Sequence, residues 1–138
     1  MAFLLDTNII SELRKGRSDC NARVWSWYEA TPLEEIYLSV LVLGEMRKGV
    51  EMKRKADPAS AAALERWLRE VARTHRARVL SISVEISEVW GRMTADSPLP
   101  VVDGLLAATA RYYGLTVVTR NERDFQRCGV DYINPFAA

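Results

Sequence analysis

Short apolar runs alternate with amphipathic segments along the whole chain, and this alternation limits the possible fold more than any other feature. The runs at residues 2–5, 36–39, 79–82 and 116–119 have the length and the apolar content of buried strands. A fifth candidate strand lies at residues 131–133. Strands that alternate with helices favour a parallel sheet with helices on both faces. The pattern therefore predicts an α/β fold with a central parallel sheet of four to five strands.

The segments between these runs carry the boundary residues of helices. Thr7 and Asn8 are candidate caps for a first helix, while Asp57-Pro58 and Ser83 are typical starts for later ones. We expect the later helices near residues 21–30, 40–55, 57–76, 83–94 and 102–113. No repeat, low-complexity tract or linker interrupts this order, so we expect residues 1–138 to form a single domain.

Composition narrows the possible environments and partners. Of 138 residues, 49% are hydrophobic and 27% charged, which supports a real core and argues against disorder. The net charge of +1 means that any nucleic-acid contact must come from a local basic patch. Cys20 and Cys128 form no C-x-x-C pair and are expected to be reduced thiols. With no signal-peptide pattern and no membrane-spanning stretch evident, we expect a soluble, cytoplasmic protein without membrane partners.

Four acidic residues, drawn from distant parts of the chain, follow short apolar runs. They are Asp6, Glu45, Asp103 and Asp124. Ligands of an open parallel sheet bind beyond the carboxyl ends of its strands, so acids placed there can converge. Converging carboxylates repel one another unless a cation lies between them, and hard oxygen ligands suit Mg²⁺ or Mn²⁺. The four acids therefore predict a divalent-metal site.

The segments around these acids, at residues 5–13, 39–49, 99–110 and 119–125, keep a characteristic order and spacing. Together they resemble the four motifs of PIN-domain nucleases, especially the VapC-type toxins of bacterial toxin–antitoxin pairs. The resemblance implies a PIN-like three-layer sandwich and Mg²⁺-dependent hydrolysis of RNA, with Mn²⁺ as a possible substitute. It also implies a homodimer and a small antitoxin that covers the active site. One departure is Gly104, where the family more often carries a larger or alanine-like residue. We expect it to loosen its helix by about 1 kcal/mol.

Each acid has an expected role in metal-assisted phosphodiester hydrolysis, which needs an activated water and stabilisation of charge on oxygen. Asp6 and Asp103 are the best direct ligands, because both are expected at strand-to-helix junctions. Glu45 reaches further and is expected to hold a bridging water or a second metal. Asp124 would complete that second position, and Glu122 is its adjacent rival.

Polar and basic residues close to the acids are further candidates for the site. Asn8, Thr119 and Asn121 could orient the carboxylates or the metal waters, although Asn8 and Asn121 would serve equally well to satisfy loop backbone. Arg120 and Arg123 are the best candidates to touch the RNA backbone. A second basic group would form either a phosphate-binding patch or a solvated helix face: Lys48, Lys53, Arg54, Lys55, Arg66, Arg69, Arg73 and Arg76.

Other chemistries have weaker support. His75 is the only histidine and is expected on the surface, which counts against a zinc site. Asp6 after a strand weakly resembles the nucleophile of aspartyl-phosphate phosphatases, but Asn8 stands where those enzymes need a second acid. A non-catalytic PIN-like module that binds RNA or protein is the remaining alternative. Trp27 lies off the apolar face of its helix and could line a groove for a partner helix.

Overall fold

The computed structural model describes residues 1–137, and a parallel five-stranded sheet forms its centre. The sheet has the order β3-β2-β1-β4-β5, and every paired strand runs parallel to its neighbour. Its strands are β1 (Phe3–Leu5), β2 (Ile36–Ser39), β3 (Val79–Leu80), β4 (Thr116–Val118) and β5 (Tyr132–Ile133). The predicted fold class is confirmed, including the short fifth strand.

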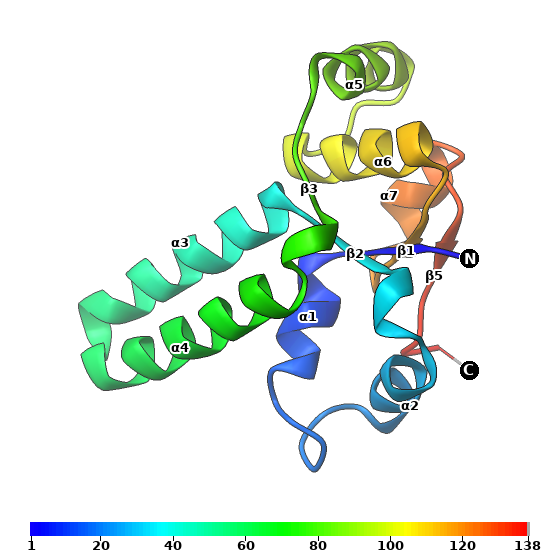
Figure 1. Cartoon of the computed structure of the whole chain (residues 1–138). Coiled ribbons are helices and arrows are strands. Elements are labelled where there is room, and N and C mark those ends of the chain that lie inside the picture. The colour runs from blue at the N-terminus through cyan, green and yellow to red at the C-terminus, as the bar shows by residue number, and fades with distance from the viewer. Residues whose placement is uncertain (138) are drawn as a thin grey trace.

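In the part of the chain that the structure describes, seven α-helices connect and cover the strands: α1 (Thr7–Leu13), α2 (Ala22–Ala30), α3 (Val40–Ala56), α4 (Pro58–Thr74), α5 (Val84–Asp96), α6 (Val101–Tyr113) and α7 (Glu122–Arg127). Figure 1 shows α5, α6 and α7 on one side of the sheet and α1 and α2 on the other. The paired helices α3 and α4 project from one edge as an arm. Within residues 1–137, no helix has both the length and the apolar character needed to cross a membrane.

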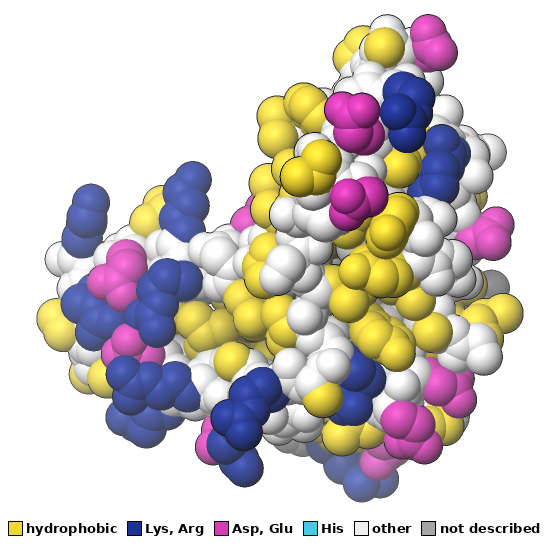
Figure 2. Space-filling model, turned by 45° about the horizontal axis from the view of Figure 1, so that its top comes forward, with side chains coloured by type: hydrophobic (Ala, Val, Ile, Leu, Met, Phe, Trp, Pro, Cys, Tyr) yellow, Lys and Arg dark blue, Asp and Glu magenta, His cyan; other side chains and the backbone are white. Residues whose placement is uncertain are grey.

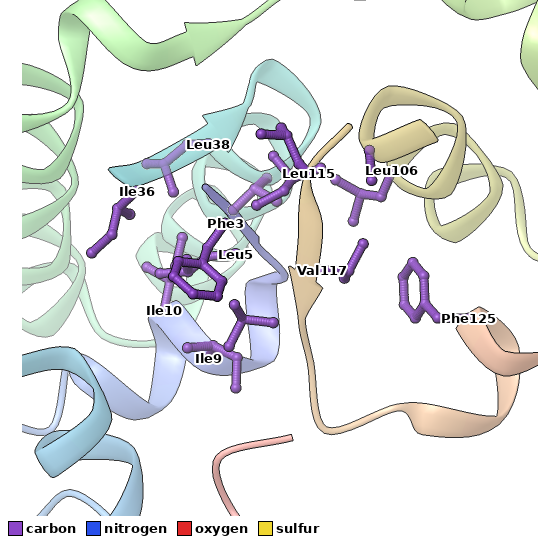
Figure 3. Close-up of a cluster of buried hydrophobic side chains, with 14 of the residues drawn as sticks. Phe3, Leu5, Ile9, Ile10, Ile36, Leu38, Leu106, Leu115, Val117 and Phe125 are labelled. Carbon is purple, nitrogen blue, oxygen red and sulfur yellow. The ribbon is translucent and has the colours of Figure 1, made fainter. Parts of the chain in front are cut away.

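The core lies on both faces of the central strands. Leu4 and Val117 pair across β1 and β4 and are fully buried. Figure 3 shows Ile9 from α1, Leu106 from α6 and Phe125 from α7 gathered around these strands. Each Å² of apolar surface buried in this core contributes roughly 25 cal/mol to the free energy of folding, and this burial stabilises the sheet with its helical layers.

Local signals located most helix starts correctly. The Asp57 carboxylate accepts a hydrogen bond from the Ser60 N–H at 3.2 Å, and the Ser83 hydroxyl oxygen accepts one from the Ile86 N–H at 3.1 Å. The predicted cap of α1 was wrong. Asp6 is the N-cap, and Thr7 and Asn8 already belong to the first turn of the helix.

Two further expectations about local structure were wrong. Asp103 does not stand at a strand-to-helix junction, because α6 directly follows α5 and a short turn, and Asp103 lies in the first turn of α6, after Pro100. Helix α7 was not expected at all. It exists because Phe125 is fully buried in the core, which ties the five polar residues of this helix to the sheet.

Packing between elements explains three residues whose surroundings the sequence alone did not determine. His75 is buried rather than on the surface, with Nδ1 2.9 Å from the Val71 carbonyl oxygen. Trp27 is half-buried and meets the Phe3 ring edge-on, at 5.3 Å between centroids. A Cβ at Gly104 would lie 2.9 Å from Trp90 Nε1, so close approach between α5 and α6 explains this glycine.

Candidate active site

The order of the strands places a ligand-binding position at the carboxyl ends of β1 and β4. The chain winds outward from β1 to β2 and β3, then returns to the other side of β1 for β4 and β5. Open α/β sheets bind ligands in the crevice at such a reversal. Asp6 and Thr119 are the residues that directly follow these two strands. The topology therefore locates the site before any side chain is considered.

Asp6 is buried at this point and held by three donors. Its Oδ1 accepts the Thr7 N–H at 2.7 Å, while Oδ2 accepts the Thr119 hydroxyl at 2.8 Å and the Asn8 amide at 3.3 Å. Burial raises the pKa of Asp6, and the neighbouring Glu45 carboxylate adds to the rise. The three hydrogen bonds lower it in part, because they favour the ionised form.

Glu45 reaches the site from α3, through a contact that the sequence analysis missed. The Thr7 hydroxyl donates to Glu45 Oε1 at 2.5 Å, joining the first turn of α1 to α3. Thr7 had been considered only as a helix cap. The signal that could have found it is its place beside Asp6, since the first turn of a helix at a strand end faces the same crevice.

Asp103 and Asp124 complete the acidic group. Burial raises the pKa of Asp103 to about 6, and the charge of Asp6 and a hydrogen bond shared with Asp124 add to the rise. The charge of Glu45 acts in the same direction. Only carboxylates in close proximity perturb one another in this way. These perturbations, with the Thr7–Glu45 hydrogen bond, place the four predicted acids near one another, from the end of β1 and from α3, α6 and α7.

Asn121 and Thr119 connect α7 to the strand end. The Asn121 side-chain amide donates to Asp124 Oδ2 at 2.9 Å, and the Asn121 N–H donates to Thr119 Oγ1 at 2.9 Å. Glu122 turns elsewhere and accepts the Asn134 amide at 3.0 Å. The geometry therefore favours Asp124 over its rival as a member of the acidic group.

The two arginines that sequence analysis placed beside the site differ in their surroundings. The Arg120 backbone N–H donates to Asn8 Oδ1 at 3.1 Å, and its guanidinium lies over the Phe136 ring, 4.5 Å from the centroid. Arg123 is exposed on α7. Asn8 consequently links Asp6 to the loop after β4, so it satisfies backbone and orients a carboxylate at once.

Carboxylate oxygens dominate the donor set, and that chemistry fits Mg²⁺ or Mn²⁺. No three His, Cys, Asp or Glu side chains within residues 1–137 form a ready-made metal cage. Mg²⁺ does not need one, because it keeps several waters and takes only one or two carboxylates directly. A carboxyl group with a pKa near 6, set among other acids, is the arrangement that a divalent cation would relieve.

Comparison with known proteins identifies relatives over the whole length of the chain. A VapC ribonuclease of Sinorhizobium fredii is 33% identical, with 97% of each chain covered. The FitAcB crystal structure from Neisseria gonorrhoeae has a TM-score of 0.88 and 30% identity, covering 99% of each chain. A toxin–antitoxin complex from Klebsiella pneumoniae has a TM-score of 0.72 and 26% identity, covering 98% of each chain.

The strand order, the acids at the strand ends and these relatives lead to one family. Residues 3–130 match the PIN domain, which is nearly the entire sheet with its helices. The chain belongs to the PIN domain family.

Proposed function

We propose that this protein is a divalent-metal-dependent endoribonuclease and the toxin of a type II toxin–antitoxin pair. The observation that carries the proposal is the convergence of Asp6, Glu45, Asp103 and Asp124 at the carboxyl ends of β1 and β4. The ribonuclease name of the Sinorhizobium fredii relative supports RNA as the substrate. Proximity of this kind is costly for folding, and a functional role explains why it is maintained.

The four acids would divide the work of holding metal and water. Asp6 and Asp103 are the proposed direct ligands, and Glu45 with Asp124 would hold coordinated waters or a second ion. When bound, Mg²⁺ or Mn²⁺ would activate the attacking water and neutralise charge on the phosphoryl and leaving oxygens. Thr7 and Thr119 would keep two of the carboxylates in place through the hydrogen bonds that they donate.

Cleavage of a defined RNA by the purified protein tests the proposal. We expect cleavage with Mg²⁺ or Mn²⁺, none in EDTA, and loss of at least a hundredfold in rate for Asp103→Asn, since charge stabilisation of this kind is typically worth that much. Glu122→Gln is the matched control, because that carboxylate faces Asn134 instead of the site. It should cut at the parent rate.

Other outcomes of this assay would point to other functions. Cleavage by Asp103→Asn at the parent rate would refute the assignment of the acids. RNA binding without metal-dependent cleavage would favour a non-catalytic module, and a phosphorylated Asp6 trapped after incubation with a phosphate ester would favour a phosphatase.

An antitoxin is the proposed protein partner, as the toxin–antitoxin complex among the structural relatives suggests. Beside Glu45 lies a pocket of about 210 Å³, lined in part by Ser11, Arg14 and Leu64. Trp67 is shared with a second, mostly apolar pocket of about 220 Å³. A partner segment lying in both pockets would also reach the acidic site, which would explain how binding blocks cleavage.

The second pocket contains polar atoms that a partner could satisfy. Trp25 Nε1 and His75 Nε2 line it and have no hydrogen-bond partner within the described part of the chain. The Val71 carbonyl oxygen can only accept, so His75 Nδ1 donates to it, and Nε2 is an acceptor in the tautomer that carries its proton on Nδ1. A hydroxyl or amide side chain, which both donates and accepts, would satisfy the two atoms.

Co-expression with a candidate antitoxin tests this partner. Ser11→Arg would fill the first pocket from its exposed rim, whereas Ser18→Arg adds the same group on an exposed turn elsewhere. We expect the antitoxin to co-purify with the parent and with Ser18→Arg but not with Ser11→Arg. Equal recovery with both variants would exclude these pockets as its binding site.

A homodimer is the last part of the proposal. Light scattering of the protein alone should give twice the chain mass of 15.6 kDa. A mass equal to one chain at micromolar concentration would contradict it.

A further inference from the structure

The charges of this chain are strongly segregated although its net charge is only +1. Residues 46–78, which include most of the arm, hold ten Lys and Arg but only four Asp and Glu, a net charge of +6. The remaining residues hold nine Lys and Arg and fourteen Asp and Glu, a net charge of −5. Figure 2 shows this concentration of basic side chains over the arm, at the left of the view. The local basic patch that the sequence analysis required is therefore the arm.

Part of this positive charge is neutralised within the arm. Glu65 accepts from Arg47 at 2.6 Å and from Arg54 at 3.2 Å, and lies 3.7 Å from Arg69. Glu70 pairs with Arg73 at 2.6 Å. These arginines behave as the solvated, ion-paired helix face that the sequence analysis held open. They are therefore poor candidates for a separate ligand.

The lysines of α3 are different. Lys48 and Lys55 are exposed, and neither has a carboxylate within 4.0 Å among the ion pairs of residues 1–137. They stand three and ten residues after Glu45, a spacing that places all three on one edge of the helix. At 1.5 Å of rise per residue, the lysines lie about 4.5 Å and about 15 Å along the axis from the acid.

An RNA substrate has to approach a site that is itself strongly acidic. Asp6, Glu45, Asp103 and Asp124 repel phosphates outside the few that a bound cation contacts. Affinity for nucleic acid comes mainly from phosphate contacts with Lys and Arg. Unpaired lysines on the helix that carries Glu45 can supply these phosphate contacts, because they lie along an exposed edge of the helix at increasing distance from the acids.

We propose that Lys48 and Lys55 form a phosphate track along α3 that guides the RNA backbone to Glu45 and the other acids. The inference rests on the proposed ribonuclease function and adds the surface by which the substrate is held. The track reads backbone charge and no bases, so it sets affinity without sequence preference.

Binding of a fluorescein-labelled single-stranded RNA, measured by anisotropy in EDTA across a salt series, tests the track. For single strands, each phosphate contact contributes about 0.7 to the slope of log affinity against log salt. Lys48→Ala/Lys55→Ala should lower that slope by about 1.4, so its affinity deficit should shrink roughly sevenfold between 50 and 200 mM salt. With Mg²⁺, we expect a raised KM and an unchanged kcat.

Arg66→Ala is the matched control, because it removes one exposed positive charge from the face of α4 that also carries Arg69 and Arg73. It should change the slope and KM little. A double lysine variant that binds RNA like Arg66→Ala would overturn the track, and so would a variant that loses only binding to an acidic partner protein. If the parent never cleaves RNA but the lysine variant still loses binding with the predicted slope, the proposed function fails and the track stands.

Discussion

Replacing Asp103 with asparagine should stabilise the metal-free protein while abolishing cleavage. Burial, helped by neighbouring acids, raises the pKa of Asp103 from 3.8 to about 6 in the folded state. A rise of this size corresponds to about 3 kcal/mol for a fully buried group. Solvent screening of this half-buried side chain reduces the expected gain to about 1–2 kcal/mol. An asparagine avoids the penalty because it has no charge.

The pH dependence follows from the direction of the pKa change. The folded state holds the Asp103 proton more tightly than the unfolded state does. This difference contributes to the parent's free energy of unfolding below pH 3.8, and the contribution is lost as pH rises through about 6. The difference between variant and parent should therefore be small near pH 4 and complete above pH 6. Adding Mg²⁺ should stabilise the parent and leave the variant unchanged. The cation would bind, and offset the repulsion among the acids, only where the Asp103 carboxylate is present.

Urea denaturation in EDTA at several pH values measures this difference. Asp96→Asn, an exposed acid at the end of α5, is the control and should stay within about 0.5 kcal/mol of the parent. The reasoning is refuted if Asp103→Asn is no more stable than the parent at pH 8 without metal.

Three further substitutions test the packing and hydrogen bonds around the site by urea denaturation, with RNA cleavage as a second readout for the last. Gly104→Ala gains about 1 kcal/mol of helix propensity but forces a Cβ against Trp90, so we expect net destabilisation of about 1 kcal/mol; a more stable variant would contradict this. Leu106→Ala removes a fully buried side chain and should cost about 2–5 kcal/mol, whereas a cost below 1 kcal/mol would mean that α6 packs less tightly than described. Thr119→Val keeps the shape but removes one of the three donors to Asp6 and leaves the Asn121 N–H without its acceptor, which should cost about 1–3 kcal/mol and slow cleavage. A neutral effect of Thr119→Val on both measurements would remove Thr119 from the site.

Local patterns were sufficient for the framework of this fold. The apolar runs at β1, β2 and β4 and the caps at Asp57 and Ser83 depend on neighbouring residues alone. Because the carboxyl ends of parallel strands share one edge, the position of Asp6 also followed from its strand. The other three acids were expected to converge with it on the same ground, but they lie in α3, α6 and α7 and not directly after strands, so that ground holds for Asp6 alone.

Contacts between distant segments were beyond the sequence. The Thr7 hydroxyl meets Glu45 across 38 positions, and only the packing of α1 against α3 reveals that bond. Helix α7 exists through the burial of Phe125, and the pocket that His75 lines also includes Leu5, Trp25 and Leu38 from distant segments. The glycine at position 104 was interpreted through its own helix, whereas its reason lies on α5. Each of these wrong or missing predictions arose because a residue was interpreted only from its neighbours in the sequence.

A crystal soaked in Mn²⁺ and measured at the manganese absorption edge tests the central claim most directly. The account predicts an anomalous peak within coordination distance of Asp6 and Asp103, absent from a crystal of Asp103→Asn. A well-ordered site with no peak, or a peak elsewhere that both crystals share, would contradict it.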